Sequence, residues 1–139
     1  MIGPRYLLDT NTFIYIRQNQ PPHVRMRFAK LGAGEVAISV ITYGELVYGV
    51  EKSLARARSL SELEEFTALI PILPLPAQAA STYGAVRRAL EAKGELIGAN
   101  DLWIAAHARA LDLTLVTNNE REFRRVNGLK IQNWVSAIR

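Results

Sequence analysis

The sequence contains no cysteine among its 139 residues and only two histidines. The lack of thiols excludes disulfide bonds, zinc–cysteine sites and thiol nucleophiles, so any bound metal must use oxygen or histidine ligands. No apolar run approaches the roughly 18 residues that a membrane span needs, and the first residues lack the basic-then-apolar layout of a signal peptide. We therefore expect a cytoplasmic protein that makes no contact with a membrane.

The remaining composition is that of an ordinary globular domain. Hydrophobic residues make up 49% of the chain and charged residues 22%, which argues against disorder and against collagen-like or coiled-coil architectures. The chain has no evident linker, internal repeat or low-complexity tract. We expect residues 1–139 to form one domain with one sizeable core.

The formal net charge is +4, from 17 basic and 13 acidic side chains. Two groups of basic residues stand out: Arg17, Arg25, Arg27 and Lys30 within the carboxylate-free stretch 10–34, and Arg121, Arg124 and Arg125. A positive surface suits a polyanionic partner, but solvated basic side chains at the rim of a domain would give the same pattern. The charges alone leave both interpretations open.

Short apolar runs alternate with longer segments of helical periodicity, and this order predicts an α/β fold. The expected strands are Tyr6–Leu8, Val36–Val40, Ile72–Leu75, Leu113–Val116 and Leu129–Ile131. Helical spacing is found in the segments Tyr43–Lys52, Gln78–Lys93 and Leu102–Leu111, the last of which is rich in alanine and should lie near the centre. Long connections between strands favour a mostly parallel sheet of four to five strands with helices on both faces.

Polar residues follow several of these strands or begin the next helix. Asp9 follows the first strand, Asn119 follows the fourth, Glu45 lies near the start of Tyr43–Lys52, and Asp101 opens Leu102–Leu111. Each has an ordinary structural explanation, because Asp and Asn cap helices and a carboxylate is favoured near a helix N-terminus. Taken singly, none of the four positions identifies a function.

Together, these positions converge on one rim of a parallel sheet, where open α/β sheets bind their ligands. Three carboxylates within about 5 Å of one another would repel by a few kcal/mol per pair at an effective dielectric near 20. A divalent cation removes that cost, and oxygen-only ligands select hard ions such as Mg²⁺ or Mn²⁺. This pattern predicts metal-assisted phosphodiester hydrolysis.

The same residues lie in motifs that resemble the PIN-domain ribonucleases, and more closely the VapC toxins of toxin–antitoxin pairs. The similar stretches run in order through the chain: LLDTN at 7–11, ISVITYGELVYGVEKS at 38–53, ILPL at 72–75, IGANDLWIAAHA at 97–108 and LVTNNEREFRRVNGLKIQNW at 115–134. The resemblance covers nearly the whole chain. It implies a three-layer α/β/α domain with an acidic metal pocket.

The resemblance implies particular roles for the matching residues. Asp9, Glu45 and Asp101 match the family's catalytic, metal-holding carboxylates, and Asn119 falls where the family often has a fourth acid. An amide there weakens the expectation of a second tight metal site. Glu122 is near enough in sequence to substitute as a ligand, although a solvated charge on a helix is the more common role for such a residue. Two further groups follow: supporting polar residues at Asn11 and Thr117, and RNA-binding arginines at Arg17, Arg121, Arg124 and Arg125.

By this resemblance, the protein is a toxin endoribonuclease that cleaves structured RNA, such as a tRNA or rRNA stem-loop, and inhibits translation. Mg²⁺, or Mn²⁺ in its place, would activate a water for in-line attack and leave a 3′-hydroxyl and a 5′-phosphate. The family further implies neutralisation by a cognate VapB-type antitoxin, a homodimer and a toxin–antitoxin hetero-oligomer. DNA contact is expected only through the antitoxin.

Three alternatives remain at the level of the sequence. A metal-free ribonuclease could use His23 and His107 as base and acid. A phosphatase could form an aspartyl intermediate on Asp9, although Asp9-Thr10-Asn11 lacks the second Asp that such enzymes usually place two residues on. Finally, Asn119 leaves open a catalytically weak or inactive PIN-fold module that binds RNA or another partner.

Overall fold

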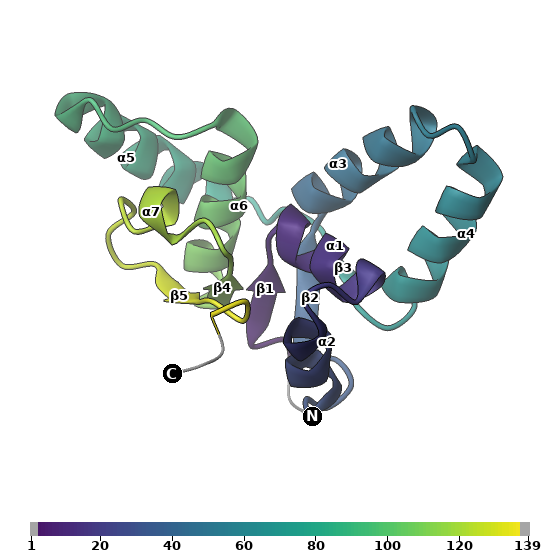
Figure 1. The fold of residues 1–139 in the computed structure, drawn as a ribbon. Coiled ribbons are helices and arrows are strands. Elements are labelled where there is room, and N and C mark those ends of the chain that lie inside the picture. Colours follow the sequence, from purple (N-terminus) through teal and green to yellow (C-terminus); the bar gives the residue numbers. More distant parts are fainter. Residues whose placement is uncertain (1–2, 137–139) are drawn as a thin grey trace.

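A wholly parallel five-stranded sheet forms the centre of the computed structural model, which describes residues 3–136 (Figure 1). The strands are β1 (Tyr6–Leu8), β2 (Val36–Ser39), β3 (Ile72–Leu73), β4 (Thr114–Val116) and β5 (Lys130–Gln132). Their order across the sheet is β3-β2-β1-β4-β5. The prediction of a mostly parallel sheet with four to five strands is confirmed, and the first strand of the chain occupies its middle.

The edge strand β3 is shorter than the predicted Ile72–Leu75. Ile72 and Leu73 pair with Ile38 and Ser39 of β2. Pairing stops before Pro74 because proline has no backbone N–H to donate to the neighbouring strand. Proline at this place is tolerated because β3 lies at the edge of the sheet.

Helices cover both faces of the sheet, as Figure 1 shows. They are α1 (Thr10–Gln18), α2 (Pro22–Ala29), α3 (Val40–Glu51), α4 (Arg56–Thr67), α5 (Gln78–Lys93), α6 (Ala99–Ala110) and α7 (Glu120–Phe123). Alternation along β1 divides the core, because Tyr6 and Leu8 pack among α1–α4 whereas Leu7 packs among α5–α7. This arrangement is the expected three-layer α/β/α fold.

Two helices begin earlier than their periodicity predicts. The helix α3 starts at Val40 rather than Tyr43, because the Ser39 side chain accepts a hydrogen bond from the Ile41 amide and caps the helix directly after β2. The helix α6 starts at Ala99, so Asp101 lies in its first turn as expected. Both bounds of α5 agree with the prediction, and its end is marked by Gly94 in the left-handed conformation (φ 67°).

The position of β1 determines where polar side chains meet. The carboxyl ends of β1, β2 and β4 lie next to one another at one edge of the sheet, since these strands are parallel neighbours. The helices α1 and α3 begin directly at two of these ends. Across residues 3–136, no helix has both the length and the apolar character needed to cross a membrane.

Candidate metal centre at the carboxyl edge of the sheet

Asp9 is the most buried of the predicted acidic site residues, with 5% of its surface exposed. It caps α1, because its Oδ1 accepts a hydrogen bond from the Thr12 amide at 2.9 Å. Its Oδ2 accepts a second bond from the Thr117 hydroxyl at 2.6 Å. Burial raises the pKa of Asp9 above its usual range, and the bonds from Thr117 and Thr12 oppose that rise.

Thr117 connects Asp9 to the segment that follows β4. Its hydroxyl is completely buried and also accepts a hydrogen bond from the Asn119 amide at 2.8 Å. The Asn119 side chain makes no capping bond to α7, so the simple capping role considered for it is absent. Asn11 is exposed in the first turn of α1, and the bonds that orient Asp9 come from Thr12 and Thr117.

Glu45 lies in the second turn of α3, six residues after the capping Ser39. The expectation that it belongs to the first turn, where the helix dipole favours a carboxylate, is therefore wrong. Its Oε1 accepts a hydrogen bond from the Thr10 hydroxyl at 2.5 Å, which joins α3 to α1. Thr10 was not singled out from the sequence, although its place beside Asp9 in the DTN motif was a usable signal.

Asp101 is half-buried at the start of α6, and its pKa is raised to about 6. Burial is the main cause, followed by the negative charges of Asp9, Glu45 and Glu122. The charge of Glu45 also raises the pKa of Asp9. The structure therefore places three carboxylates from distant parts of the chain within electrostatic reach of Asp101: Asp9, Glu45 and Glu122.

These carboxylates provide only hard oxygen donors, the type that Mg²⁺ and Mn²⁺ prefer. Within residues 3–136, no three acidic or histidine side chains stand close enough together to hold a metal ion without rearrangement. Like charges repel, so these side chains must approach one another more closely to gather around one ion. The carboxylate oxygens are suitable ligands for a divalent cation. A bound cation would also relieve the repulsion at Asp101, which favours binding of the cation.

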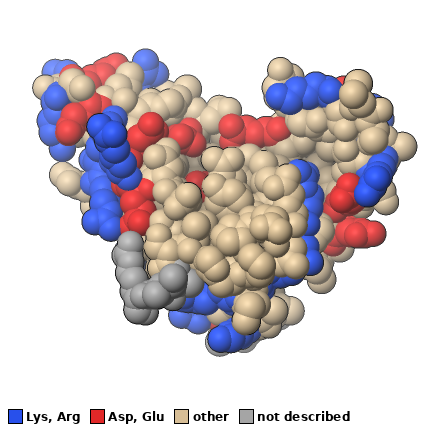
Figure 2. Space-filling view, viewed as in Figure 1, with Lys and Arg blue, Asp and Glu red and all other residues tan. Residues whose placement is uncertain are grey.

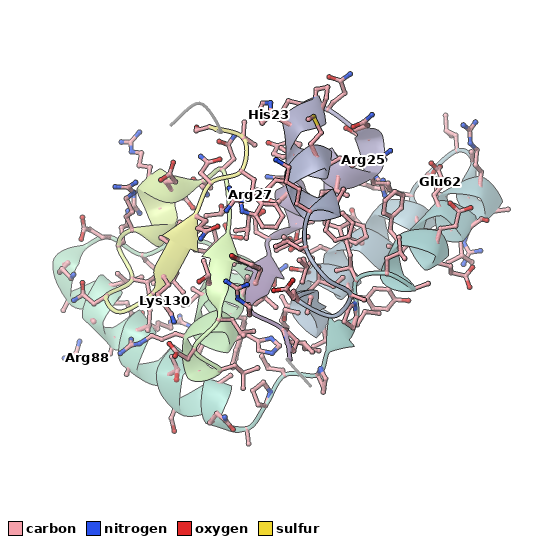
Figure 3. The ribbon with its side chains drawn as sticks, turned by 90° about the horizontal axis from the view of Figure 1, so that it is seen from below. His23, Arg25, Arg27, Glu62, Arg88 and Lys130 are labelled. Carbon is pink, nitrogen blue, oxygen red and sulfur yellow. The ribbon has the colours of Figure 1, made fainter. Side chains whose placement is uncertain are left out.

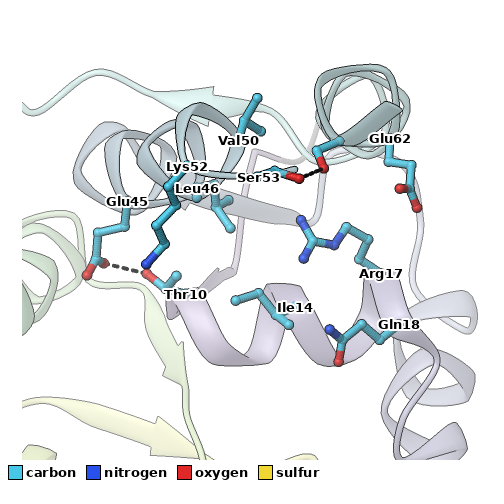
Figure 4. Close-up of a pocket in the computed structure, with 12 residues that line it drawn as sticks. Thr10, Ile14, Arg17, Gln18, Glu45, Leu46, Val50, Lys52, Ser53 and Glu62 are labelled. Atoms are coloured by element: carbon cyan, nitrogen blue, oxygen red, sulfur yellow. Dashed lines mark hydrogen bonds between the residues drawn. The ribbon is translucent and has the colours of Figure 1, made fainter. Parts of the chain in front are cut away.

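Three adjoining hollows open around Glu45. One, of about 380 Å³, is lined by Gly98 to Asp101, and a second, of about 670 Å³, reaches the exposed Tyr48. The third is a groove of about 530 Å³ between α1, α3 and α4, with Arg17 and Glu62 on its far side (Figure 4). Figure 2 shows acidic side chains in the notch between the two lobes and basic side chains on both lobes. The edge of the sheet that carries Asp9, Glu45, Asp101 and Glu122, here called the acidic rim, is thus open to a large ligand.

The basic residues divide into two groups according to their contacts. Arg25 donates to the carbonyls of Ile16 and Arg17, and Arg27 donates to Gln132, so both stabilise the packing of α2. Viewed from below, these two arginines and His23 lie together on α2, far from Arg88 on α5 (Figure 3). The part of the first cluster that faces the Glu45 groove is Arg17.

The second cluster is also divided. Arg125 is partly buried and donates to the carbonyls of Glu95 and Leu96, which fastens the loop that leads into α6. Arg124 is exposed and paired with Glu120 at 2.5 Å. Arg121 is exposed on α7, one residue before Glu122. Arg121 is therefore the member of this cluster that is best available to an external anion.

The two histidines occupy different environments. His23 lies in α2, not in the surface loop suggested by the preceding prolines, and its Nε2 bonds to the Val135 carbonyl. His107 is completely buried in α6, and its Nδ1 lies 2.8 Å from the Ser39 hydroxyl. Neither position offers a base and acid facing one open pocket, which removes the geometric basis for a metal-free mechanism.

Comparison with known proteins places this geometry in context. Residues 6–129 match the PIN domain family. The chain is 44% identical to the "tRNA(fMet)-specific endonuclease VapC" of Salmonella typhimurium over 130 residues, which cover 94% of this chain and 98% of the relative. It is 43% identical to "Ribonuclease VapC2" of Haemophilus influenzae, with the same coverage.

Solved structures show the same likeness in three dimensions. The crystal structure of DNA-bound VapBC from Salmonella typhimurium contains a chain with a TM-score of 0.88 and 44% identity, covering 94% of this chain and 98% of that one. VapBC2 from Rickettsia felis, bound to a DNA fragment from the promoter, gives a TM-score of 0.87 at 40% identity, with 93% and 98% covered. In both comparisons the likeness extends over more than nine tenths of this chain.

Proposed function

The chain belongs to the PIN-domain family and, within it, to the VapC ribonucleases, and on this premise we propose that it cleaves structured RNA by divalent-metal-assisted phosphodiester hydrolysis. The observation that carries the proposal is the acidic rim. Its four carboxylates come from separate segments of the chain: Asp9, Glu45, Asp101 and Glu122. Repulsion by the other three helps to raise the pKa of Asp101. A cation-binding site explains why a fold would keep this arrangement.

The residues proposed to hold the cation are Asp9, Glu45 and Asp101. Asp9 is preoriented by Thr12 and Thr117, and Glu45 by Thr10. A bound Mg²⁺ or Mn²⁺ would supply a water of lowered pKa and neutralise charge on the phosphoryl group. The hydroxyls of Thr10 and Thr117 keep one oxygen of each carboxylate occupied, which limits the rotation of both side chains.

We assign Glu122 the place of the fourth acid, next to Asn119. Its charge reaches Asp101 and helps to raise the pKa of that residue, whereas the Asn119 amide side chain adds no charge. Asn119 can still act as a neutral oxygen ligand or contact the substrate. Glu122 thus compensates for the departure from the family pattern.

The proposed substrate class is structured RNA, and tRNA in particular, because the Salmonella relative is named as a tRNA(fMet)-specific endonuclease. Arg17 and Arg121 lie on opposite sides of the acidic rim and would contact backbone phosphates. Direct attack of water gives a 3′-hydroxyl and a 5′-phosphate. We propose that the cleavage takes place in the cytoplasm and inhibits translation.

The proposed protein partner is an antitoxin of the VapB type. Structural relatives are described as VapBC complexes, and two of them are bound to DNA. A homodimer assembled with the antitoxin would follow the same organisation, with the antitoxin making the DNA contact.

Cleavage of total cellular RNA by the purified protein tests the enzymatic proposal. We expect cleavage with Mg²⁺ or Mn²⁺, loss of cleavage with a chelator, and loss in Asp9→Asn. End mapping should find 5′-phosphates. Products with 2′,3′-cyclic phosphates would contradict the mechanism, and RNA binding without cleavage would favour an inactive binding module.

A further inference from the structure

His107 is a buried polar residue that the proposed chemistry does not use. Its side chain has no exposed surface, and Leu102, Ile104, Ala105 and Ala108 of the same helix are buried with it. Its Nε2 has no hydrogen-bond partner among the described residues. A polar atom left in this way costs free energy, so packing alone would favour an apolar side chain at this position.

The other ring nitrogen makes one specific contact. His107 Nδ1 lies 2.8 Å from the hydroxyl of Ser39, and this hydroxyl also accepts the hydrogen bond from the Ile41 amide that caps α3. Because Ser39 Oγ already serves as an acceptor, its proton is available to Nδ1. Burial lowers the pKa of His107, which keeps the ring neutral and Nδ1 able to accept that proton.

This hydrogen bond joins the two helices that carry opposite sides of the acidic rim. Ser39 precedes Glu45 by six residues on α3, and His107 follows Asp101 by six residues on α6. The two helices pack against each other. Thr10 ties α3 to α1 through Glu45, and Thr117 ties β4 to α1 through Asp9. Among the described residues, the His107–Ser39 bond is the side-chain hydrogen bond that connects α6 to the start of α3.

We propose that His107 is a positioning residue, which acts through Ser39 to fix α6 against the start of α3 and thereby sets the spacing between Asp101 and Glu45. The proposal rests on the proposed function, since the spacing matters for a shared divalent cation. It gives the buried imidazole a role that an apolar side chain of similar volume could not fill.

Two substitutions separate positioning from packing. His107→Leu keeps the volume and removes both ring nitrogens, so its unfolding midpoint should equal or exceed that of the parent protein. His107→Asn keeps a polar atom near the place of Nδ1 but leaves unfilled volume, so it should lower the midpoint. His107→Leu therefore loses the bond to Ser39 but keeps its stability, whereas His107→Asn keeps a polar partner for Ser39 but loses stability.

The measurement is the Kd for Mn²⁺ alone, by titration calorimetry or by the electron paramagnetic resonance signal of free Mn²⁺, with the thermal midpoint measured in parallel. We expect His107→Leu to raise this Kd about tenfold or more, as is typical when the partner of a ligand-bearing group is removed. His107→Asn should stay within about threefold of the parent, on the same scale. Ser39→Ala should raise the Kd as His107→Leu does, although it also removes the cap of α3 and should lower the thermal midpoint. The Kd of the double variant should be no higher than that of the weaker-binding single variant.

Controls make the outcomes distinguishable. Thr67→Ala removes a bond to the Leu63 carbonyl within α4 and should change stability without changing the Kd. Parent-like Mn²⁺ affinity in a folded His107→Leu variant would overturn the positioning role and leave the proposed function intact. A parent protein that binds no Mn²⁺ at all would overturn both.

Discussion

Asp9 and Asp101 belong to the same acidic rim but are held in opposite ways. Asp9 is buried at the end of β1 and accepts two hydrogen bonds, from the Thr12 amide and the Thr117 hydroxyl. Asp101 is only half-buried, and its strongest described interactions are burial and repulsion by other carboxylates. One carboxylate therefore serves the fold as well as the site, whereas the other is placed for the site at a cost to the fold.

The largest expected effect is one that the two carboxylates share. Asp9→Asn and Asp101→Asn should each reduce RNA cleavage by about a thousandfold or more, because each removes a charge proposed to hold the cation. Rates measured on an end-labelled RNA at saturating Mn²⁺ test this. Retention of activity within about tenfold in Asp101→Asn would remove Asp101 from the proposed cation ligands.

The side chain that orients Asp9 should have the next largest effect. Thr117→Val keeps the shape of the side chain and removes the hydroxyl that donates to Asp9, so we expect Mn²⁺ affinity to fall about 10- to 100-fold. The unfolding free energy should also fall by about 1–2 kcal/mol, because Asp9 is buried. Thr117→Ser retains the hydroxyl and serves as the matched control. Equal affinities in the Val and Ser variants would contradict the role of the hydroxyl.

The repulsion at Asp101 should also make the stability of the metal-free protein depend on pH. The folded-state pKa of Asp101 is about 6, above its ordinary value of 3.8. Between these values the folded state binds more protons than the unfolded state, so stability must fall as pH rises from about 4 to above 6, and then level off. The loss at this carboxyl should be about 1 kcal/mol after allowance for solvent screening.

Urea unfolding of the chelator-treated protein across this pH range measures the effect. In Asp101→Asn the decline should be smaller, and saturating Mn²⁺ should cancel it in the parent, since the cation binds the folded state. Stability that rises with pH over this interval would contradict the assignment of Asp101 as the repelled group.

The smallest expected effect concerns the surface around the rim. Arg121→Ala should weaken RNA binding about threefold and lower the slope of log affinity against log salt by about 1, with little change in stability. RNA binding is measured by filter binding in proteins that also carry Asp9→Asn, so that the RNA is not cleaved during the assay. Arg58→Ala, which alters an exposed arginine on α4 paired with Glu62, is the control. Equal salt slopes for the two variants would remove Arg121 from the RNA interface.

The features that follow from local pattern could be predicted from the sequence. Short apolar runs gave all five strands, and a polar residue after an apolar run located Asp9 at a strand end. The start of α3 was missed because Val40 and Ile41 are β-branched and continue the apolar run, so the cap at Ser39 was hidden. This error placed Glu45 one turn too close to the helix N-terminus.

Contacts across the fold could not be predicted in this way. The bonds from Thr10 to Glu45 and from Ser39 to His107 join residues 35 and 68 positions apart, and no periodicity encodes such pairs. The same holds for Arg25 and Arg125, which read as free positive charge in the sequence but bind backbone carbonyls in the structure. Charge composition thus overstates the number of arginines available to RNA.

The central place of β1 has a consequence for synthesis of the chain. Asp9 leaves the ribosome before the other strands of the sheet, yet the hydroxyl that holds it belongs to Thr117, 108 positions later. A nascent chain that ends before β4 has neither this hydroxyl nor the strand that borders β1 on one side. The acidic rim is therefore complete only after β4 and Thr117 have been synthesised and packed beside β1, so a shorter nascent chain lacks the bond that orients Asp9.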